Sequence, residues 1–417
     1  MHFDHKHTDP CENQDFVGIN IPYDCYVNIE VLGMTGASVN MVLEHMERQR
    51  IMIEGFEEGV VFTDREVEVS RIFSRIPVFP GYVTMLYGPR GCGKTTLLRV
   101  LMGSVGSLGL NTNMVFVSSG EGSLGAREIL ASRGLLALVR EAGRWFGFDV
   151  DHYGRVIGSI RALDLINILS GYMARKYSGS GRDVVIILDG IRVGTLKGVR
   201  LFRRRLERLY RTIERDHRMH IEGGGRGISL IIMVGGALIR EVWRGVAGDM
   251  DLGITWSLIW NLPREASDNL ADQLGIDLDR DLLWRLAGGN PRALIKIKTL
   301  GLEKWVELVV IRSLRKAVFR SIRRYGGIDK TLLEMGRIIE DLDNLGNSWA
   351  VYYLVKSDIL IPMHIATTRL SRIPAEPWIG MRYSFQIPAH YYALRAVVEK
   401  KRAAVEVDDV LREAKKG

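Results

Sequence analysis

An apolar stretch followed at once by a glycine-rich, lysine-containing turn constrains this chain more than any other part. Val83-Thr-Met-Leu-Tyr87 reads as a buried strand, and Gly88-Pro-Arg-Gly-Cys-Gly-Lys-Thr95 follows it directly. Apolar side chains then recur at helical spacing from Leu97 to Val105. Glycines let backbone N–H groups turn inward and approach a ligand closely, which a Cβ atom would obstruct. The sequence therefore predicts a strand–loop–helix unit whose loop binds an anion.

The loop has the spacing G-x-x-x-x-G-K-[ST] of a phosphate-binding loop. Lys94 can reach the β- and γ-phosphates of a nucleotide, and the Thr95 hydroxyl can ligate Mg²⁺. The N-terminus of the following helix adds partial positive charge. A glycine-rich turn that merely precedes a lysine is the alternative, and the flanking strand and helix disfavour it. We predict that ATP and Mg²⁺ bind here, with contacts from Gly88, Pro89, Arg90, Gly91, Cys92, Gly93, Lys94, Thr95 and Thr96.

A second apolar strand, Val184-Val-Ile-Ile-Leu-Asp189, ends in a carboxylate, as the metal-holding strand of many ATPases does. Asp189 and Thr95 are the predicted metal site, and Asp189 and Lys94 are predicted to take part in catalysis. Glu121, in Ser118-Ser-Gly-Glu-Gly122, is a candidate general base. A solvated loop glutamate is the alternative interpretation of Glu121.

Composition and length limit the remaining possibilities. The chain has 417 residues, which predicts two or three domains, and 47% hydrophobic with 25% charged residues, which is typical of globular proteins. No apolar run approaches the roughly 18 to 20 residues that span a bilayer. Three widely spaced cysteines provide no disulfide framework or paired zinc-ligand motif. We therefore expect an intracellular, cytoplasmic protein without a membrane partner.

The formal charge of +8 is concentrated on two predicted helices, Val199–Arg215 and Val306–Tyr325. Such helices fit DNA or an acidic protein as a partner. A solvated face with ion pairs to Glu207 and Glu214 is at least as good an explanation for the first helix. We also predict a helix over Ala126–Trp145, strands at Ile228–Val234 and Leu252–Trp256, and a final helix over His390–Arg402.

Two further motifs accompany the loop and the Asp189 strand. Phe62-Thr-Asp-Arg-Glu-Val-Glu68 resembles the signature F-x-x-R-E-x-E-L, and Gly288-Gly-Asn-Pro-Arg-Ala-Leu294 begins a helix with Asn290 as N-cap and Pro291 in its first turn. In this order and spacing, the four motifs resemble the archaeal ATPase family, signal-transduction ATPases with numerous domains that are related to AAA+ proteins. The resemblance covers about residues 60 to 300. A glutamate usually follows the aspartate in that branch, whereas position 190 is glycine here, so we expect slow hydrolysis.

The resemblance implies an α/β P-loop NTPase fold of the ASCE/AAA+-like kind, with a parallel sheet flanked by helices and an extra strand between the loop strand and the Asp189 strand. It implies that Phe62 and Arg65 lie near the adenine and that Pro291 and Arg292 face the nucleotide from a lid. The expected division is an N-terminal extension (1–59), an ATPase core (60–256), a helical lid (257–304) and a winged-helix-like domain (305–417).

These features predict an ATPase that acts as a nucleotide-dependent switch or motor, with a nucleotide-dependent oligomer among its expected partners. An ATP-licensed DNA-binding protein, initiator-like or a mobile-element helper, is the second hypothesis. A small-molecule phosphotransferase is a third, which the long separation of Asp189 from the loop and the appended domains disfavour.

Overall fold

The computed structural model describes most of the chain beyond residue 35. The described residues are 36–53, 56–62, 64–73, 83–119, 126–131, 135–151, 154–157, 160–177, 179–191, 196–225, 227–235, 239, 242–243, 254–346 and 348–416. Glu121 lies outside this set, as do residues 1–35 of the predicted N-terminal extension (1–59).

The main sheet has seven strands in the order β12-β10-β3-β9-β8-β4-β5, and only β4 and β5 pair antiparallel. The phosphate loop follows β3, Asp189 lies in β8, and β9 lies between those two strands, as predicted. The strands are β3 (Val83–Tyr87), β4 (Thr112–Ser119), β5 (Ala126–Ala131), β8 (Asp183–Ile191), β9 (Gly227–Val234), β10 (Thr255–Leu258) and β12 (Thr368–Arg369).

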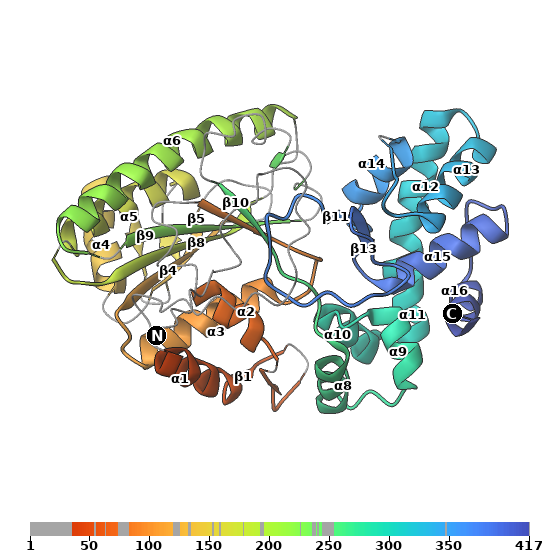
Figure 1. Ribbon diagram of the computed structural model, residues 1–417, viewed down its shortest axis with the longest axis horizontal. Helices are drawn as coiled ribbons and strands as arrows, with labels where there is room; N and C mark the ends of the chain where they lie inside the picture. Colours follow the sequence, from red (N-terminus) through yellow and green to blue (C-terminus); the bar gives the residue numbers. More distant parts are fainter. Residues whose placement is uncertain are drawn as a thin grey trace, which may run out of the picture.

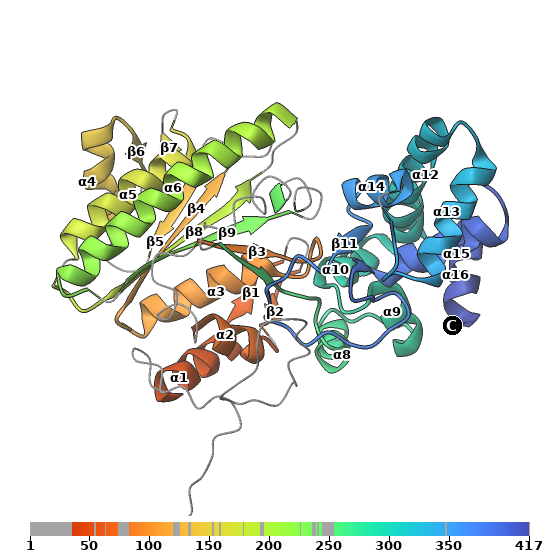
Figure 2. The ribbon, with the colours of Figure 1, turned by 45° about the horizontal axis from the view of Figure 1, so that its top comes forward.

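Helices cover both faces of this sheet (Figures 1 and 2). Alternate residues of β8 show why: Val185 and Ile187 pack with one helix layer, and Ile186 and Leu188 pack with the other. The first layer comprises α1 (Gly36–Glu47), α2 (Glu66–Phe73) and α3 (Lys94–Ser107). The second comprises α4 (Leu135–Phe146), α5 (Ala162–Lys176) and α6 (Leu196–Glu222). The predicted α/β fold class, a parallel sheet flanked by helices, is confirmed.

Two predictions from sequence pattern are wrong at their edges. The predicted helix over Ala126–Trp145 is a strand, β5, followed by α4 from Leu135, because residues 126–131 pair with the open edge of β4. Pairing in the folded protein overrides a weak helical preference. The strand predicted at Leu252–Trp256 is β10, which runs from Thr255 to Leu258. Two short hairpins complete this half of the chain: β1 (Arg50–Ile51) with β2 (Val60–Val61), and β6 (Asp149–Val150) with β7 (Val156–Ile157).

The remaining residues form a mainly helical half, at the right of Figure 1. Most of its buried apolar residues, from Leu262 to Ala414, belong to one continuous cluster, so the predicted lid and C-terminal domain share a core. The elements are α8 (Arg264–Gln273), α9 (Arg280–Ala287), α10 (Pro291–Leu300), α11 (Leu302–Trp305), the π-helix η1 (Val306–Ile311), α12 (Arg312–Tyr325), α13 (Ile328–Glu340), α14 (Trp349–Lys356), β11 (Leu360–Pro362), β13 (Tyr383–Phe385), α15 (Pro388–Glu399) and α16 (Val407–Lys416).

Helices α12 to α14 are followed by the antiparallel pair β11–β13, within the region 305–417 that we expected to be winged-helix-like. The connection between these strands is not a tight turn. Residues 363–372, which we call the strap, cross to the main sheet and contribute β12 beside β10 (Figure 1). Leu370 N donates to Leu258 O at 2.8 Å, and Thr367 N donates to Trp256 O at 2.9 Å. The C-terminal half thus completes one edge of the main sheet.

Candidate functional site

The phosphate loop has the backbone geometry that its glycines permit. Gly91 and Gly93 have φ values of 89° and 96°, a region that residues with a Cβ atom rarely adopt. A Cβ atom on Gly91 would lie 2.5 Å from Arg292 Cβ. Helix α3 begins at Lys94, with Gly93 as its N-cap, so its first turn points at the loop. The loop therefore depends on glycine both for its own turn and for contact with α10.

The three predicted catalytic and metal-binding side chains that the structure describes lie together at this loop. Lys94 Nζ donates to Gly88 O and Pro89 O, each at 3.0 Å, so the ammonium group lies against the backbone of the loop. Thr95 Oγ1 donates to Asp189 Oδ2 at 2.9 Å, although the two residues are 94 positions apart. The Thr96 side chain is partly exposed in the same first turn of α3.

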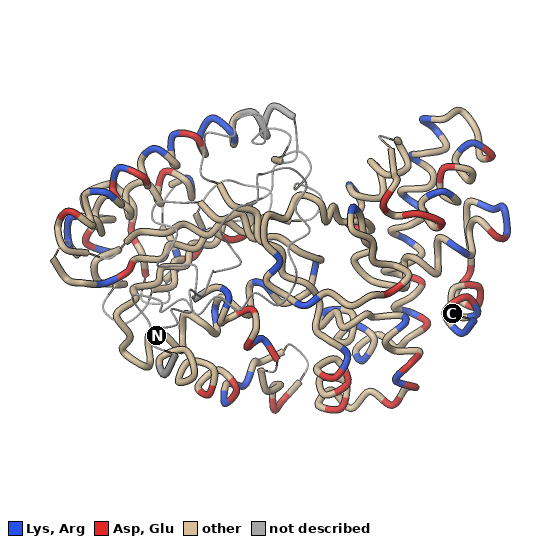
Figure 3. The backbone as a smooth tube through the Cα atoms, in the orientation of Figure 1, with Lys and Arg blue, Asp and Glu red and all other residues tan. Residues whose placement is uncertain are grey.

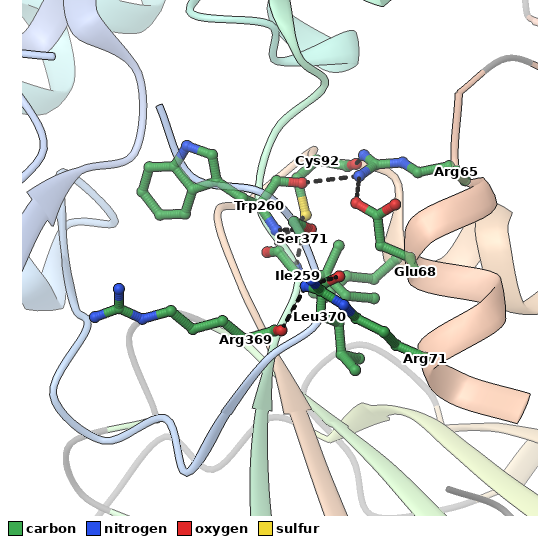
Figure 4. Close-up of polar contacts among 10 residues, drawn as sticks. Arg65, Glu68, Arg71, Cys92, Ile259, Trp260, Arg369, Leu370 and Ser371 are labelled. Carbon is green, nitrogen blue, oxygen red and sulfur yellow. Dashed lines mark hydrogen bonds and ion pairs between the residues drawn. The ribbon is translucent and has the colours of Figure 1, made fainter. Parts of the chain in front are cut away.

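Arg65 is buried and bonds to the backbone of the loop (Figure 4). Its guanidinium donates to Cys92 O, to Trp260 O at 3.1 Å and to Glu68 Oε1 at 2.8 Å. Charge-assisted bonds of this kind hold the loop backbone against α2 and the end of β10. Phe62 is buried in the apolar layer with α1 to α3. The structure thus places Phe62 and Arg65 beside the loop, and their contact with adenine stays a prediction.

A buried amide network joins the outer turn of the loop to the helical half. Asn290 Nδ2 donates to Arg90 O at 3.1 Å and to Asn261 Oδ1 at 2.9 Å. Gln386 Oε1 accepts from Arg90 N at 2.7 Å, and Gln386 O accepts from Asn261 Nδ2 at 3.0 Å. Asn290 also caps α10 through Ala293 N, as predicted. Sequence reasoning missed Asn261 and Gln386 because isolated amide residues form no motif.

The N-terminus of α10 lies directly on the loop. Arg292 N donates to Gly91 O at 3.3 Å, and Pro291 occupies the first turn of the helix. Both residues that the resemblance places at the nucleotide therefore lie next to the loop in space. Their contacts with a nucleotide stay predictions.

Gly190 has a backbone conformation that leaves no room for a side chain. Its φ is 82°, and a Cβ atom would lie 2.8 Å from Ser119 O, less than any ordinary contact distance. The pairing of β8 with β9 is irregular between Leu188 and Ile191, at this point. This backbone conformation is therefore incompatible with a glutamate at position 190.

The described residues lack two other kinds of functional feature. No described helix is long and apolar enough to cross a membrane. In the same part of the chain, no group of three or more His, Cys, Asp or Glu side chains is arranged to hold a metal ion.

No protein-family model matches the sequence, and a comparison with curated protein sequences finds no match. Among solved structures, the chain is similar to the Aeropyrum pernix ORC2 protein in its ADP form, with 14% identity and a TM-score of 0.37, over 86% of this chain and 96% of that chain. It is similar to ADPNP–ADP complexes of the same protein, with 14% identity and a TM-score of 0.35, over 84% and 92% of the chains. Both scores are low, so a functional proposal has to rest on the geometry of this chain.

Proposed function

We propose that this chain binds ATP with Mg²⁺ and works as a nucleotide-dependent switch with slow ATP hydrolysis. The hydrogen bond from Thr95 Oγ1 to Asp189 Oδ2, beside a lysine folded into a glycine-rich loop, is the observation that supports this most. A hydroxyl and a carboxylate are oxygen ligands of the kind that Mg²⁺ prefers. When bound with ATP, the ion would neutralise part of the phosphate charge.

The side chains at the loop have distinct roles in this proposal. Lys94 exchanges its two carbonyl partners for oxygens of the β- and γ-phosphates, which offer a full negative charge. Thr95 and Asp189 hold the metal. The loop N–H groups and the start of α3 bind the phosphates by their partial positive charge. Gly190 provides no general base, which supports slow turnover, below the roughly 1 s⁻¹ at the low end of common enzyme rates.

The helical half is the proposed output of the switch. Arg292 approaches the loop from α10, and Gln386 holds Arg90 N from the end of β13. A nucleotide that moves the outer turn of the loop changes both contacts, so the lid (257–304) and the C-terminal region (305–417) respond together. We keep these boundaries, with the core at 60–256, as part of the proposal.

The experiment is ATP binding to Lys94→Ala, measured by titration calorimetry at matched Mg²⁺. We expect a loss of affinity between about tenfold and about a hundredfold, because a hydrogen bond to a charged group contributes about 1.5–3 kcal/mol. Lys298→Ala is the matched control. Lys298 lies on α10, and its Nζ also donates to a backbone carbonyl, Gly275 O. Unchanged ATP affinity in a folded Lys94→Ala protein would refute the assignment.

A second function, ATP-licensed DNA binding, is favoured by one difference between the basic helices. On α6, arginines pair with acids, including Arg203 with Glu207 at 2.9 Å and Arg218 with Glu214 at 2.7 Å. Along α6, blue and red alternate in Figure 3. Helix α12 contains no acidic residue, and none of its basic side chains makes an ion pair with any described residue. The basic residues of α12 are Arg312, Arg315, Lys316, Arg320, Arg323 and Arg324.

Aromatic side chains accompany the unpaired charges of α12. Phe319 is 48% exposed on α12 and Trp349 is 40% exposed at the start of α14. The Arg324 guanidinium lies 4.1 Å from the Trp349 ring centroid. Cations without acidic partners fit a phosphate backbone, and exposed rings fit bases. DNA is therefore the partner that this surface favours over an acidic protein.

Charge reversal on α12 tests this second function. Arg320→Glu with Arg323→Glu should weaken retention of DNA and flatten its salt dependence by about 0.9 in log–log slope for each phosphate that the helix no longer neutralises. ATP binding should be unchanged. Arg204→Glu with Arg208→Glu on α6 changes the net charge equally and is the control. Equal weakening in both variants would assign the effect to net charge and would exclude a site on α12.

A further inference from the structure

Every exposed side chain of α12 is either a cation or Phe319. Phe319 lies in the middle of the helix and is 48% exposed. At about 3.6 residues per turn, Arg315, Lys316 and Arg323 lie one turn away from it on the same face. A flat apolar ring is therefore surrounded by positive charge on the exposed face of this helix.

The Phe319 ring is uncovered. Within the part of the chain that the structure describes, no cation lies over this ring and no other aromatic ring packs against it. Burial of a phenylalanine ring is favourable, so an uncovered ring is a surface on which a flat group of a ligand gains by packing. The surrounding cations favour a ligand with negative charge. A nucleic acid combines flat groups with negative charge.

A second flat surface lies at the C-terminal end of α12, beside the start of α14 (Figure 1). The Arg324 guanidinium lies over the Trp349 ring, 4.1 Å from its centroid. Tyr325 Oη accepts from Trp349 N at 3.0 Å, which fixes the start of α14 against α12. Bases stack on guanidinium planes as well as on aromatic rings. Phe319 and Arg324 are about 7.5 Å apart along the helix axis, roughly two nucleotide steps, so one strand can contact both.

The contacts open to the Phe319 ring distinguish a single strand from a duplex. In a duplex each base is stacked between its neighbours, so its flat faces are inaccessible to a side chain. The duplex grooves offer base edges, which amide, carboxylate and guanidinium groups read, and thymine methyl groups. Helix α12 exposes no amide or carboxylate. Phe319 therefore has a full stacking partner only in a single strand, whereas the cations can contact the phosphates of either form.

We propose that α12 binds single-stranded DNA, with one base stacked on Phe319 and the phosphates bound by Arg315, Lys316 and Arg323. This inference rests on the second function proposed above, DNA binding, and names the form of DNA that the surface recognises. Because every base has a flat face, we expect little sequence preference.

The test is fluorescence anisotropy on the full chain with three probes of about 16 nucleotides, with and without ATP and Mg²⁺. The probes are a mixed-sequence strand, the duplex of that strand, and an abasic strand of the same length. The abasic strand keeps the phosphates and lacks only the bases. We expect the mixed-sequence strand to bind at least about fivefold more tightly than the abasic strand. Equal binding of these two probes would overturn the proposal.

Variants of Phe319 locate the stacking contact. Phe319→Leu keeps an apolar side chain but removes the flat ring, so it should weaken the mixed-sequence strand at least about fivefold and leave the abasic strand and the duplex unchanged. Phe319→Trp keeps a flat ring and should bind the strand at least as tightly as wild-type protein.

Phe146→Leu is the matched control, because Phe146 is 50% exposed at the end of α4, in the other half of the chain. This variant should change the binding of no probe. If Phe319→Leu weakens the duplex as much as the strand, the ring contacts duplex DNA and the proposal is wrong. If Phe319→Leu fails to fold, the comparison with the abasic strand still decides.

Failure of this inference and failure of the proposed functions give different results. Phe319→Leu should leave ATP affinity unchanged, so the assignment of the nucleotide loop stands or falls separately. Arg320→Glu with Arg323→Glu should weaken every probe, because it removes contacts to phosphates. If that double variant weakens the duplex while Phe319→Leu affects no probe, α12 binds DNA by charge alone and the stacking inference is wrong. No binding of any probe at low ionic strength would overturn DNA binding and this inference together.

Discussion

At the scale of single residues, Gly190 leaves no room for a side chain directly after Asp189. Its positive φ and the 2.8 Å approach to Ser119 O exclude the carboxylate that the resemblance leads one to expect. Restoring a glutamate would therefore not restore a general base. The side chain would have to displace the backbone of β8 next to Asp189, and the carboxylate that accepts from Thr95 Oγ1 would move with it.

We predict that Gly190→Glu lowers the free energy of unfolding by about 1–3 kcal/mol and does not raise ATP turnover. Gly109→Glu is the control, because Gly109 also has a positive φ, 63°, but a Cβ atom there meets nothing within 4 Å. Chemical denaturation and a phosphate-release assay measure the two effects. A Gly190→Glu protein as stable as the Gly109→Glu control, with faster turnover, would contradict this explanation.

Local motifs predicted the strand–loop–helix unit, because the apolar run, the glycines and the helical spacing of apolar residues each indicate one of its parts. The glycine spacing of the loop identifies Lys94 and Thr95, and the apolar run before Asp189 identifies that aspartate. The partners of these residues were not predictable in the same way. Gln386 lies 296 positions from Arg90, and Asn261 contacts Asn290 only in the folded chain. Neither amide has a neighbour in sequence that indicates its role.

At the scale of elements, α2 and the residue before it connect two distant parts of the chain. Arg65 holds the phosphate loop, and one and a half turns further along Arg71 Nη1 donates to Arg369 O and Leu370 O at 2.9 and 3.0 Å (Figure 4). Ser371 Oγ accepts from Trp260 N at 2.7 Å beside them. The helix therefore contacts both the loop and the strap.

We predict that Arg71→Ala loosens the strap without abolishing ATP binding. Removing charge-assisted bonds to two carbonyls should lower stability by about 1.5–3 kcal/mol. Hydrogen exchange should rise at Thr367 and Leu370, whose N–H groups bond to Trp256 O and Leu258 O. Arg99→Ala on α3 removes an exposed ion pair with Glu128 and serves as the control. Unchanged exchange at both amides in Arg71→Ala would show that Arg71 does not hold the strap.

Elements with strong local patterns were predicted, and elements defined by pairing were not. Continuous apolar runs indicated β8 and β9, because strands covered on both faces need such runs. Strand β5 and strand β12 are short and carry no such pattern. Their structure depends on the open edges of β4 and β10, which only the folded sheet provides.

At the scale of the whole molecule, the strap makes the two halves interdependent. We predict that residues 1–304 alone self-associate, because removal of β12 leaves the edge of β10 open to pairing with other chains. Size-exclusion chromatography with light scattering measures this. Co-expression with residues 305–417 should restore a one-to-one complex, and the same fragment with Leu370→Pro should not. A monomeric 1–304 fragment that unfolds cooperatively would contradict the prediction.

The strap also sets the order in which the protein can be completed during synthesis. Trp256 N donates to Thr367 Oγ1, which lies 111 positions later in the chain, so this hydrogen bond cannot form until residue 367 has been synthesised. Domains generally fold as they leave the ribosome, N-terminal part first. Here the sheet that carries the phosphate loop keeps an unpaired edge until nearly all of the helical half has been translated. A ribosome that stalls within α12 to α14 therefore presents a nearly complete sheet with one edge open to pairing, and we expect a chaperone to protect that edge during synthesis.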